Sequence, residues 1–238
     1  MALDICRRAE PSALVNTVAL AWTGWIRTRP AGAMSSSIAF GGGRVFRRFL
    51  ETAAGVLRDQ PSTLDRLEFF WGDERCVPPD DAESNYRLAH ESFFAPLGIP
   101  AGRIHRLRGE ADPEDAARAA EVVLRVATGT GPTAMPRLDL VFLGLGEDGH
   151  VASLFPGAPA AVTESTAVYL PVVGPKPPPQ RLTLSYAAIA AAREVWVIAS
   201  GVGKEEAMRE SLRTGGRTPF ARVLRERAQT RLFTDIPG

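Results

Sequence analysis

Short apolar runs alternate with polar, glycine-rich turns along the chain, which predicts a series of short strands. The run at 138–143 is almost uninterrupted, as is typical of a strand that is buried on both faces of a parallel sheet. Pro171 lies within another run and would place that strand at a sheet edge, because proline cannot donate to a ladder. We predict strands at 37–40, 67–71, 138–143, 167–173, 194–199 and 232–236.

Between these runs, apolar residues recur at spacings of three and four, which gives a helix one apolar face. After Arg44, for example, they occur at Phe46, Leu50, Ala53 and Leu57. Pro, Gly and Ser residues at 27–37 instead predict a loop. We predict helices at 13–27, from 44 onward, and at 84–94, 112–127, 182–192 and 204–212.

Strands and helices therefore alternate, with no internal repeat and no linker long enough to divide the chain. This order is typical of an α/β fold with a largely parallel sheet and right-handed crossovers. It is also compatible with one antiparallel strand at an edge of the sheet. A chain of 238 residues with 45% apolar residues is long enough for a sizeable core. We expect one α/β domain over residues 1–238.

Composition and charge exclude several other classes of protein. The formal net charge is +1, with charged residues spread along the chain, so neither a nucleic-acid surface nor an acidic tail is expected. Cys6 and Cys76 are far apart and lack metal-site spacing, which favours a reduced, cytoplasmic protein. No run approaches the roughly 18 apolar residues of a membrane helix. We expect a soluble monomer or weak homodimer without membrane contact.

The strand at 138–143 runs into a glycine-rich loop that holds Glu147, Asp148 and His150. In open α/β sheets, ligands bind beyond the carboxyl ends of the strands. A neutral imidazole, with an unperturbed pKa of about 6.5, is well suited to take a proton from water, so we nominate His150 as a general base that Asp148 could orient. The structural alternative is that His150 only caps the next turn.

Gly41, Gly42 and Gly43 stand between a predicted strand and a predicted helix. The first N–H groups of a helix have no partner within it, so this turn could cradle an anion, and Arg44 could add charge. The alternatives are a turn that only tightens packing and an arginine that is merely exposed. A dinucleotide site is not favoured, because the turn lacks the G-x-G-x-x-G spacing.

Asp73 and Arg75 follow the strand at 67–71, at the same expected sheet edge. The guanidinium of Arg75 suits a phosphate or a lactone oxygen, and Asp73 or Glu74 could hold that guanidinium or accept sugar hydroxyls. A structural ion pair within this loop is the alternative. Cys76 is a less favoured nucleophile, because no motif ties a histidine or an acid to it.

The proline-dense segment at 174–179 predicts a stiff loop. It would present Lys176, with Arg181 close behind, to a phosphate at little entropic cost. A solvated proline linker is the alternative.

The sequences of these segments resemble those of a known family. G-L-G-E-D-G-H-V-A-S-L-F-P-G at 144–157 is similar to the signature loop of the 6-phosphogluconolactonases, relatives of the glucosamine-6-phosphate deaminases within one superfamily. Three further stretches match in order, and together they cover most of the chain. They are F-F-W-G-D-E-R-C-V-P-P-D with S-N-Y-R at 69–87, G-P-K-P-P-P-Q-R-L-T-L at 174–184 and S-G-V-G-K-E-E-A at 200–207.

This resemblance implies a Rossmann-like three-layer αβα sandwich with a mostly parallel sheet. It implies an enzyme of the pentose phosphate pathway that hydrolyses 6-phosphoglucono-δ-lactone to 6-phosphogluconate, with no cofactor and no metal. It also puts Asn85 near the site and the loop of Lys176 and Arg181 at the substrate phosphate. At its glycine turn the chain departs from the family's commoner motif S-G-G-S-T-P. Phe40 and Arg44 stand there in place of residues with hydroxyl side chains.

Three functional hypotheses remain at this point. In the first, His150 activates water, Arg75 or loop N–H groups stabilise the oxyanion, and Lys176 and Arg181 hold the phosphate with the glycine turn. In the second, the protein is a phosphosugar isomerase or deaminase in which Asp73 or Asp148 abstracts a carbon-bound proton. In the third, it is a catalytically silent phosphosugar-binding protein.

Overall fold

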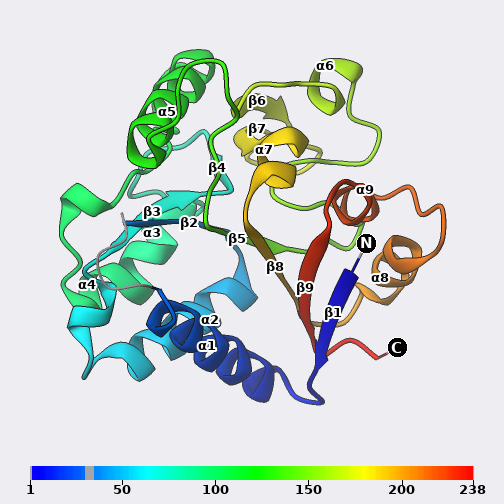
Figure 1. The fold of residues 1–238 in the computed structure, drawn as a ribbon. Helices are drawn as coiled ribbons and strands as arrows, with labels where there is room; N and C mark the ends of the chain where they lie inside the picture. The colour runs from blue at the N-terminus through cyan, green and yellow to red at the C-terminus, as the bar shows by residue number, and fades with distance from the viewer. Residues whose placement is uncertain (1, 30–34, 238) are drawn as a thin grey trace.

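The computed structural model describes residues 2–29 and 35–237, so part of the predicted loop at 27–37 lies outside the described residues. Its centre is a six-stranded sheet in the order β1-β9-β8-β5-β2-β3, and every neighbouring pair in it is parallel (Figure 1). The predicted α/β class is therefore confirmed. The strands are β1 (Ala2–Arg7), β2 (Ser36–Phe40), β3 (Leu67–Trp71), β5 (Leu140–Gly144), β8 (Glu194–Ala199) and β9 (Gln229–Thr234).

The order of these strands reverses next to β2. From β2 the chain adds β3 on one side, and it later returns to place β5, β8 and β9 in succession on the other side. In parallel sheets such a reversal opens a crevice between the loops that follow the two strands. The loops that begin at Gly41 and Leu145 therefore meet at the carboxyl edge of the sheet.

Helices cover the sheet in layers (Figure 1). Helices α1 and α2 lie together on one face, and α2 also contacts the segment formed by α3, the π-turn η2 and α4. Helix α5 packs on strands outside the main sheet, and α9 contacts both α7 and α8. The helices are α1 (Pro11–Arg27), α2 (Arg44–Leu57), α3 (Asn85–Ala89), η2 (His90–Phe94), α4 (Ala95–Leu97), α5 (Pro113–Thr128), α6 (Ala160–Thr163), α7 (Tyr186–Ala191), α8 (Glu205–Leu212) and α9 (Pro219–Glu226), with short 3₁₀ turns η1 (Pro61–Leu64) and η3 (Ala101–Arg103).

A second, three-stranded antiparallel sheet stands apart from the main one, in the order β4-β7-β6. Its strands are β4 (Asp73–Arg75), β7 (Gln180–Leu184) and β6 (Tyr169–Val173). The strand with Pro171 is at an edge, as predicted, but the antiparallel pairing belongs to this separate sheet and not to an edge of the main sheet. Asp73–Arg75 is strand and not loop.

Two other predictions for this region are wrong in part. Arg181 was expected on a loop with Lys176, but it lies in β7, where it pairs in register with Arg75. The helix predicted at 182–192 begins only at Tyr186, after the strand ends. The strand predicted from 138 begins at Leu140, and the sequence analysis did not predict β1 or α9.

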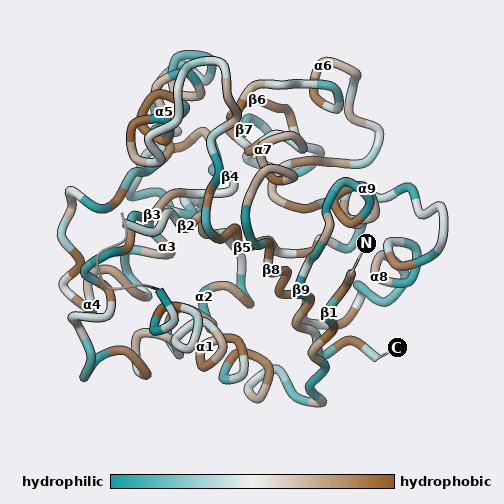
Figure 2. Tube along the Cα trace, viewed as in Figure 1, coloured by the Kyte–Doolittle hydropathy of each residue, from teal (hydrophilic) through white to brown (hydrophobic). Residues whose placement is uncertain are grey.

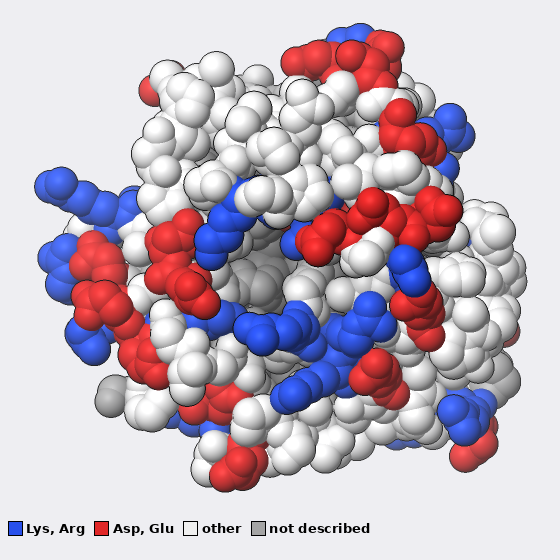
Figure 3. All heavy atoms as spheres, turned by 180° about the vertical axis from the view of Figure 1, so that it is seen from behind, with Lys and Arg blue, Asp and Glu red and all other residues white. Residues whose placement is uncertain are grey.

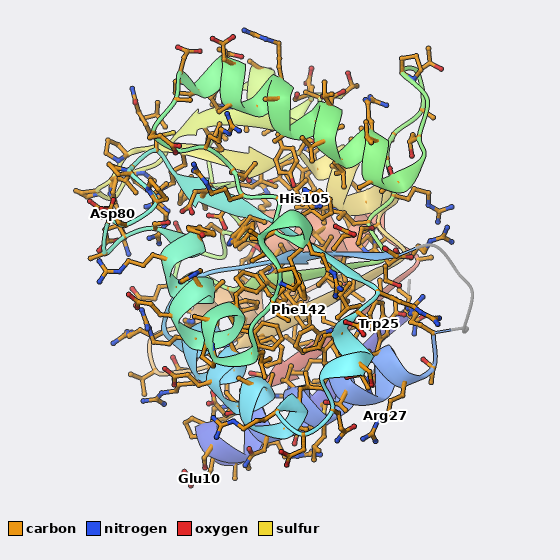
Figure 4. All side chains as sticks on the ribbon, turned by 90° about the vertical axis from the view of Figure 1, so that its left-hand side faces the viewer. Glu10, Trp25, Arg27, Asp80, His105 and Phe142 are labelled. Atoms are coloured by element: carbon orange, nitrogen blue, oxygen red, sulfur yellow. The ribbon has the colours of Figure 1, made fainter. Side chains whose placement is uncertain are left out.

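The core between the main sheet and the α1 and α2 layer is rich in aromatic side chains. Phe142 of β5 lies in it near the centre of the molecule (Figure 4), edge-on to Trp22 of α1 at a centroid distance of 5.8 Å. Phe40 of β2 is fully buried there too, 5.7 Å from Trp22. Hydrophobic residues also run along β8 and β9 (Figure 2). Phe40 therefore stabilises the core and does not face a ligand.

Within residues 2–29 and 35–237, the helices are all too short or too polar to cross a membrane.

Candidate active site

A cavity of about 600 Å³ opens at the carboxyl edge of the main sheet, where the strand order reverses. Basic side chains border a hollow on this side of the molecule above and below (Figure 3). All the site residues predicted from the sequence line the cavity except Asp148, which contacts His150. The predicted residues in its wall are Gly41, Gly42, Gly43, Arg44, Asp73, Arg75, Asn85, His150, Lys176 and Arg181.

His150 and Asp148 form a close pair in the loop after β5. Nδ1 of His150 lies 2.5 Å from Oδ1 of Asp148, and the backbone N–H of His150 donates to the same oxygen at 3.1 Å. Partial burial alone would raise the pKa of Asp148, but the charge and hydrogen bonds of His150 outweigh it and lower that pKa. Asp148 is therefore an ionised acceptor at neutral pH, and it fixes the orientation of the imidazole.

Phe155 lies between His150 and the small sheet. Its ring centroid is 4.9 Å from that of His150, and the guanidinium of Arg181 is 5.6 Å from the ring centroid. Such an arrangement allows a favourable cation–π contact with Arg181. The side chain thus packs against both the imidazole and a basic residue of the cavity wall.

Asp73 is almost fully buried and is held by neighbours from two other segments. The hydroxyl of Ser153 donates to Oδ2 of Asp73 at 2.7 Å, and Nδ2 of Asn85 donates to the Asp73 carbonyl at 2.9 Å. These contacts tie β4 to the loop of His150 and to the start of α3. The predicted site residues Asp73 and Asn85 are thereby brought together.

Arg75 is not paired with its neighbours in sequence. Its guanidinium donates to the carbonyl of Glu83 at 2.5 Å and to Oε2 of Glu83 at 3.2 Å. Glu74, which was considered as its partner, is buried and accepts bonds from Ser84 and from the backbone N–H groups of residues 75, 85 and 86. Burial raises the pKa of Glu74 to about 6 despite these bonds. Glu74 therefore anchors the start of α3.

Arg181 is a buried cation that donates to the backbone carbonyl groups of Lys176 and Pro178. Burial lowers its pKa, and the neighbouring guanidinium of Arg75 lowers it further. In the described part of the chain, Arg181 has no carboxylate within salt-bridge distance. A buried guanidinium without a carboxylate partner, next to that of Arg75 in the wall of the same cavity, favours the binding of an anion.

Cys76, the alternative nucleophile, is half-buried next to this region. Burial raises the pKa of its thiol, and the charge of Glu74 adds to the effect. A thiol with a raised pKa is less often in the reactive thiolate form.

The glycine turn packs closely against its surroundings. A Cβ on Gly42 would lie 2.0 Å from Oδ1 of Asn85, well inside van der Waals contact. Gly43 is the N-cap of α2 and provides no side-chain hydrogen bond, so the first N–H groups of the helix lack a side-chain acceptor there. The turn can therefore approach a ligand with its backbone.

Gly42→Ala should weaken substrate binding while the protein remains folded. The new methyl group must displace the Asn85 amide, and overpacking of this kind costs about 1 to 3 kcal/mol. We expect KM to rise about fivefold or more, while the midpoint of thermal unfolding falls by only a few degrees. A large fall of that midpoint with unchanged KM would show that the turn has a packing role only.

Several cavity residues were not among the predicted site residues. Arg48 follows Arg44 by one helical turn, and Ser200, Gly201, Val202 and Lys204 follow β8 at the same sheet edge. The i, i+4 spacing from Arg44 was a signal that could have identified Arg48. Within residues 2–29 and 35–237, no group of three or more His, Cys, Asp or Glu side chains is arranged to hold a metal ion.

The sequence matches one family model over residues 9–233, that of the glucosamine-6-phosphate isomerases/6-phosphogluconolactonase. It is 38% identical to the 6-phosphogluconolactonase of Mycobacterium tuberculosis over 187 residues, which are 76% of this chain and 72% of that protein. Identity to the 6-phosphogluconolactonase of Streptomyces coelicolor is 36% over 189 residues, with the same coverage of 76% and 72%.

Solved structures of 6-phosphogluconolactonases are also similar to this chain. The 6-phosphogluconolactonase of Trypanosoma brucei superposes with a TM-score of 0.82 at 30% identity, covering 97% of this chain and 95% of that one. The Trypanosoma cruzi 6-phosphogluconolactonase gives 0.84 at 27% identity, with 98% and 96% covered. A monomeric glucosamine-6-phosphate deaminase gives 0.80 at 18% identity, covering 98% and 97%, a likeness that extends to the fold alone.

Proposed function

The chain belongs to the family of glucosamine-6-phosphate isomerases and 6-phosphogluconolactonases and is an enzyme of the second type; from this we propose that it hydrolyses 6-phospho-D-glucono-1,5-lactone to 6-phosphogluconate with His150 as general base. This is a hydrolase step of the oxidative pentose phosphate pathway. The observation that carries the proposal is the imidazole of His150, paired with Asp148, in the wall of a cavity rich in basic side chains.

The tautomer of His150 follows from its partner. Asp148 accepts the hydrogen of Nδ1, which leaves Nε2 with a lone pair. As the oxygen of a water molecule bonds to the lactone carbonyl carbon, Nε2 takes a proton from it. The bond from that carbon to the ring oxygen then breaks, and the imidazolium returns the proton to the leaving oxygen. The products are a hydroxyl and a carboxylic acid, which releases its remaining proton to the solvent and becomes a carboxylate, with no covalent intermediate.

The basic residues of the cavity are proposed to hold the negative charges. Arg75 or nearby N–H groups stabilise the tetrahedral oxyanion. Lys176 and Arg181, with the turn formed by Gly41, Gly42 and Gly43, hold the phosphate. Asp73 and Asn85 lie where they can contact sugar hydroxyls. Arg181 suits its role because its charge is buried next to Arg75 without a carboxylate partner among the described residues.

Arg181→Ala should weaken binding of the phosphorylated lactone by about 1.5 to 3 kcal/mol, the usual value of a hydrogen bond to a charged group. The unphosphorylated lactone should be affected little, because it lacks the group that Arg181 binds. Steady-state KM values for both lactones measure this difference. Equal losses for the two would remove Arg181 from the phosphate site.

The other hypotheses give different products. A deaminase would release ammonia from a phosphorylated amino sugar, and a silent binding protein would bind 6-phosphogluconate without turnover. A pH-stat assay with the phosphorylated lactone, corrected for spontaneous hydrolysis, separates the three. Binding without acid release, or ammonia release, would refute the proposal. A single domain over residues 1–238, a monomer or weak homodimer and a cytoplasmic location stay predictions.

A further inference from the structure

Helix α2 presents two arginines to the cavity from one of its faces. Arg44 and Arg48 are four residues apart, so they lie one above the other on the helix surface, and both line the cavity wall. Arg47, on a different face of the same helix, does not line the cavity and instead pairs with Glu91 at 3.5 Å. Of these three arginines, Arg47 is therefore paired with a carboxylate outside the cavity, whereas Arg44 and Arg48 face the cavity.

These two cations have no anionic partner in the structure. Within residues 2–29 and 35–237, neither guanidinium group makes a hydrogen bond or ion pair, although most other arginines of the chain do. Like charges four residues apart destabilise a helix, and a cation in its first turn opposes the helix dipole. Both costs disappear when an anion binds between the two side chains and the N-terminus of α2.

A third cation belongs to the same wall. Lys204, the N-cap of α8, also lines the cavity. Burial lowers its pKa; the carboxylates of Glu147 and Asp235 oppose this shift, and Arg44 adds to it, which places Arg44 within electrostatic range. Arg44, Arg48 and Lys204 are contributed by α2 and α8, whereas Arg75 and Arg181 lie on the small sheet.

We propose that Arg44 and Arg48 form an arm of α2 that binds the phosphate of the substrate, and that Arg48 determines the preference for a phosphorylated ligand. The arm replaces, with charge, the hydroxyl groups that the glycine turn lacks, since Phe40 is in the core and Gly43 has no side chain. The phosphate is then held between the α2 arm and the basic residues of the small sheet. This inference rests on the proposed function for the identity of the substrate.

The test compares Arg48→Ala with Arg47→Ala, which removes an equal charge from the same helix outside the cavity. Arg48→Ala should raise KM for the phosphorylated lactone about threefold to tenfold, the range of a solvent-exposed charged contact, and leave D-glucono-1,5-lactone unchanged. Arg47→Ala should change neither. Equal effects of the two variants, or equal effects on the two lactones, would overturn the proposal.

A second variant tests whether charge has replaced hydroxyls. Arg44→Thr puts a hydroxyl at position 44; position 43 is unsuitable because Gly43 has a φ of +89°, which strains other residues. The affinity of the wild type for 6-phosphogluconate should fall with added salt, and that of an Arg44→Thr, Arg48→Ala variant should fall less steeply. The same salt dependence in both would overturn the proposal.

Calorimetry with 6-phosphogluconate as the probe gives this readout without turnover. If the wild type hydrolyses no lactone but binds 6-phosphogluconate through Arg48, the proposed function fails and the α2 arm stands. If the wild type hydrolyses the lactone and Arg48→Ala binds 6-phosphogluconate as the wild type does, only the α2 arm fails.

Discussion

His150→Asn is expected to lower kcat for the phosphorylated lactone by about a hundredfold to ten-thousandfold, the usual contribution of a general base. Asparagine keeps a hydrogen-bonding side chain next to Asp148 but has no basic nitrogen to take the proton from water. KM should stay nearly unchanged, because the cations assigned to the phosphate are untouched. Steady-state kinetics with the spontaneous rate subtracted measure both constants.

A near-normal kcat in this variant would contradict the role of His150. Proton transfer would then pass to Asp148 or Glu147, and the isomerase hypothesis would gain support. A matched control is His105→Asn, because His105 pairs with Glu68 at 2.7 Å and stacks on Phe70, away from the cavity. That variant should keep its kcat.

Gly146→Ala should lower kcat by about a hundredfold without changing a single polar group. A Cβ at position 146 would lie 2.0 Å from Nδ1 and 2.2 Å from Cε1 of His150, and 2.8 Å from Oδ1 of Asp148. The imidazole must move away from its partner, and a displacement of about 1 Å at a reacting group costs roughly this factor. Kinetics of the purified variant, with thermal unfolding measured alongside, test this.

The control for this variant is Gly55→Ala in the last turn of α2, where an added methyl group meets nothing within 4 Å. It should leave kcat unchanged and raise stability slightly, because alanine favours a helix. If Gly146→Ala keeps the kcat of the wild type, the loop around His150 is more adaptable than the close packing implies. The base would then not depend on the pairing with Asp148.

Local patterns predicted most of the main sheet because four of its strands are buried over almost their whole length. The apolar runs that became β2, β3, β5 and β8 carry that signal without help from distant residues. Strand β1, four of whose six residues are exposed, carries no such signal and went unpredicted. Its place depends on pairing with β9, at the other end of the chain.

Two strands of the small sheet, β4 and β7, were missed for the same physical reason. Strand β4 has only three residues, and it exists because Arg75 pairs with Arg181 more than a hundred positions away. The alanine-rich stretch after residue 186 favours a helix, and the prediction extended that helix backward over β7. Periodicity along the chain cannot report a long-range register, so the contact between these two arginines needed the structure.

The residues of the site were easier to predict from the sequence than the contacts that they make. Motifs after the strands pointed to His150, Asp73, Arg75 and the glycine turn, because parallel strands share one carboxyl edge. They could not reveal that Arg75 pairs with Glu83, or that Phe155 packs against both His150 and Arg181. Such contacts depend on how loops from different strands pack.

The pH dependence of kcat, measured for the wild type, His150→Asn and Glu74→Gln, tests the central claim most directly. The wild-type rate should rise with pH on the acidic side of its profile, since only a neutral imidazole can act as the base. Asp148 has a lowered pKa and stays ionised near neutral pH. Glu74, with a pKa raised to about 6, is a group whose titration could produce a similar rise of the rate with pH. If His150 is the general base, the acidic limb of the pH profile should disappear in His150→Asn and persist in Glu74→Gln. An acidic limb that persists in His150→Asn, or that vanishes in Glu74→Gln, would contradict it.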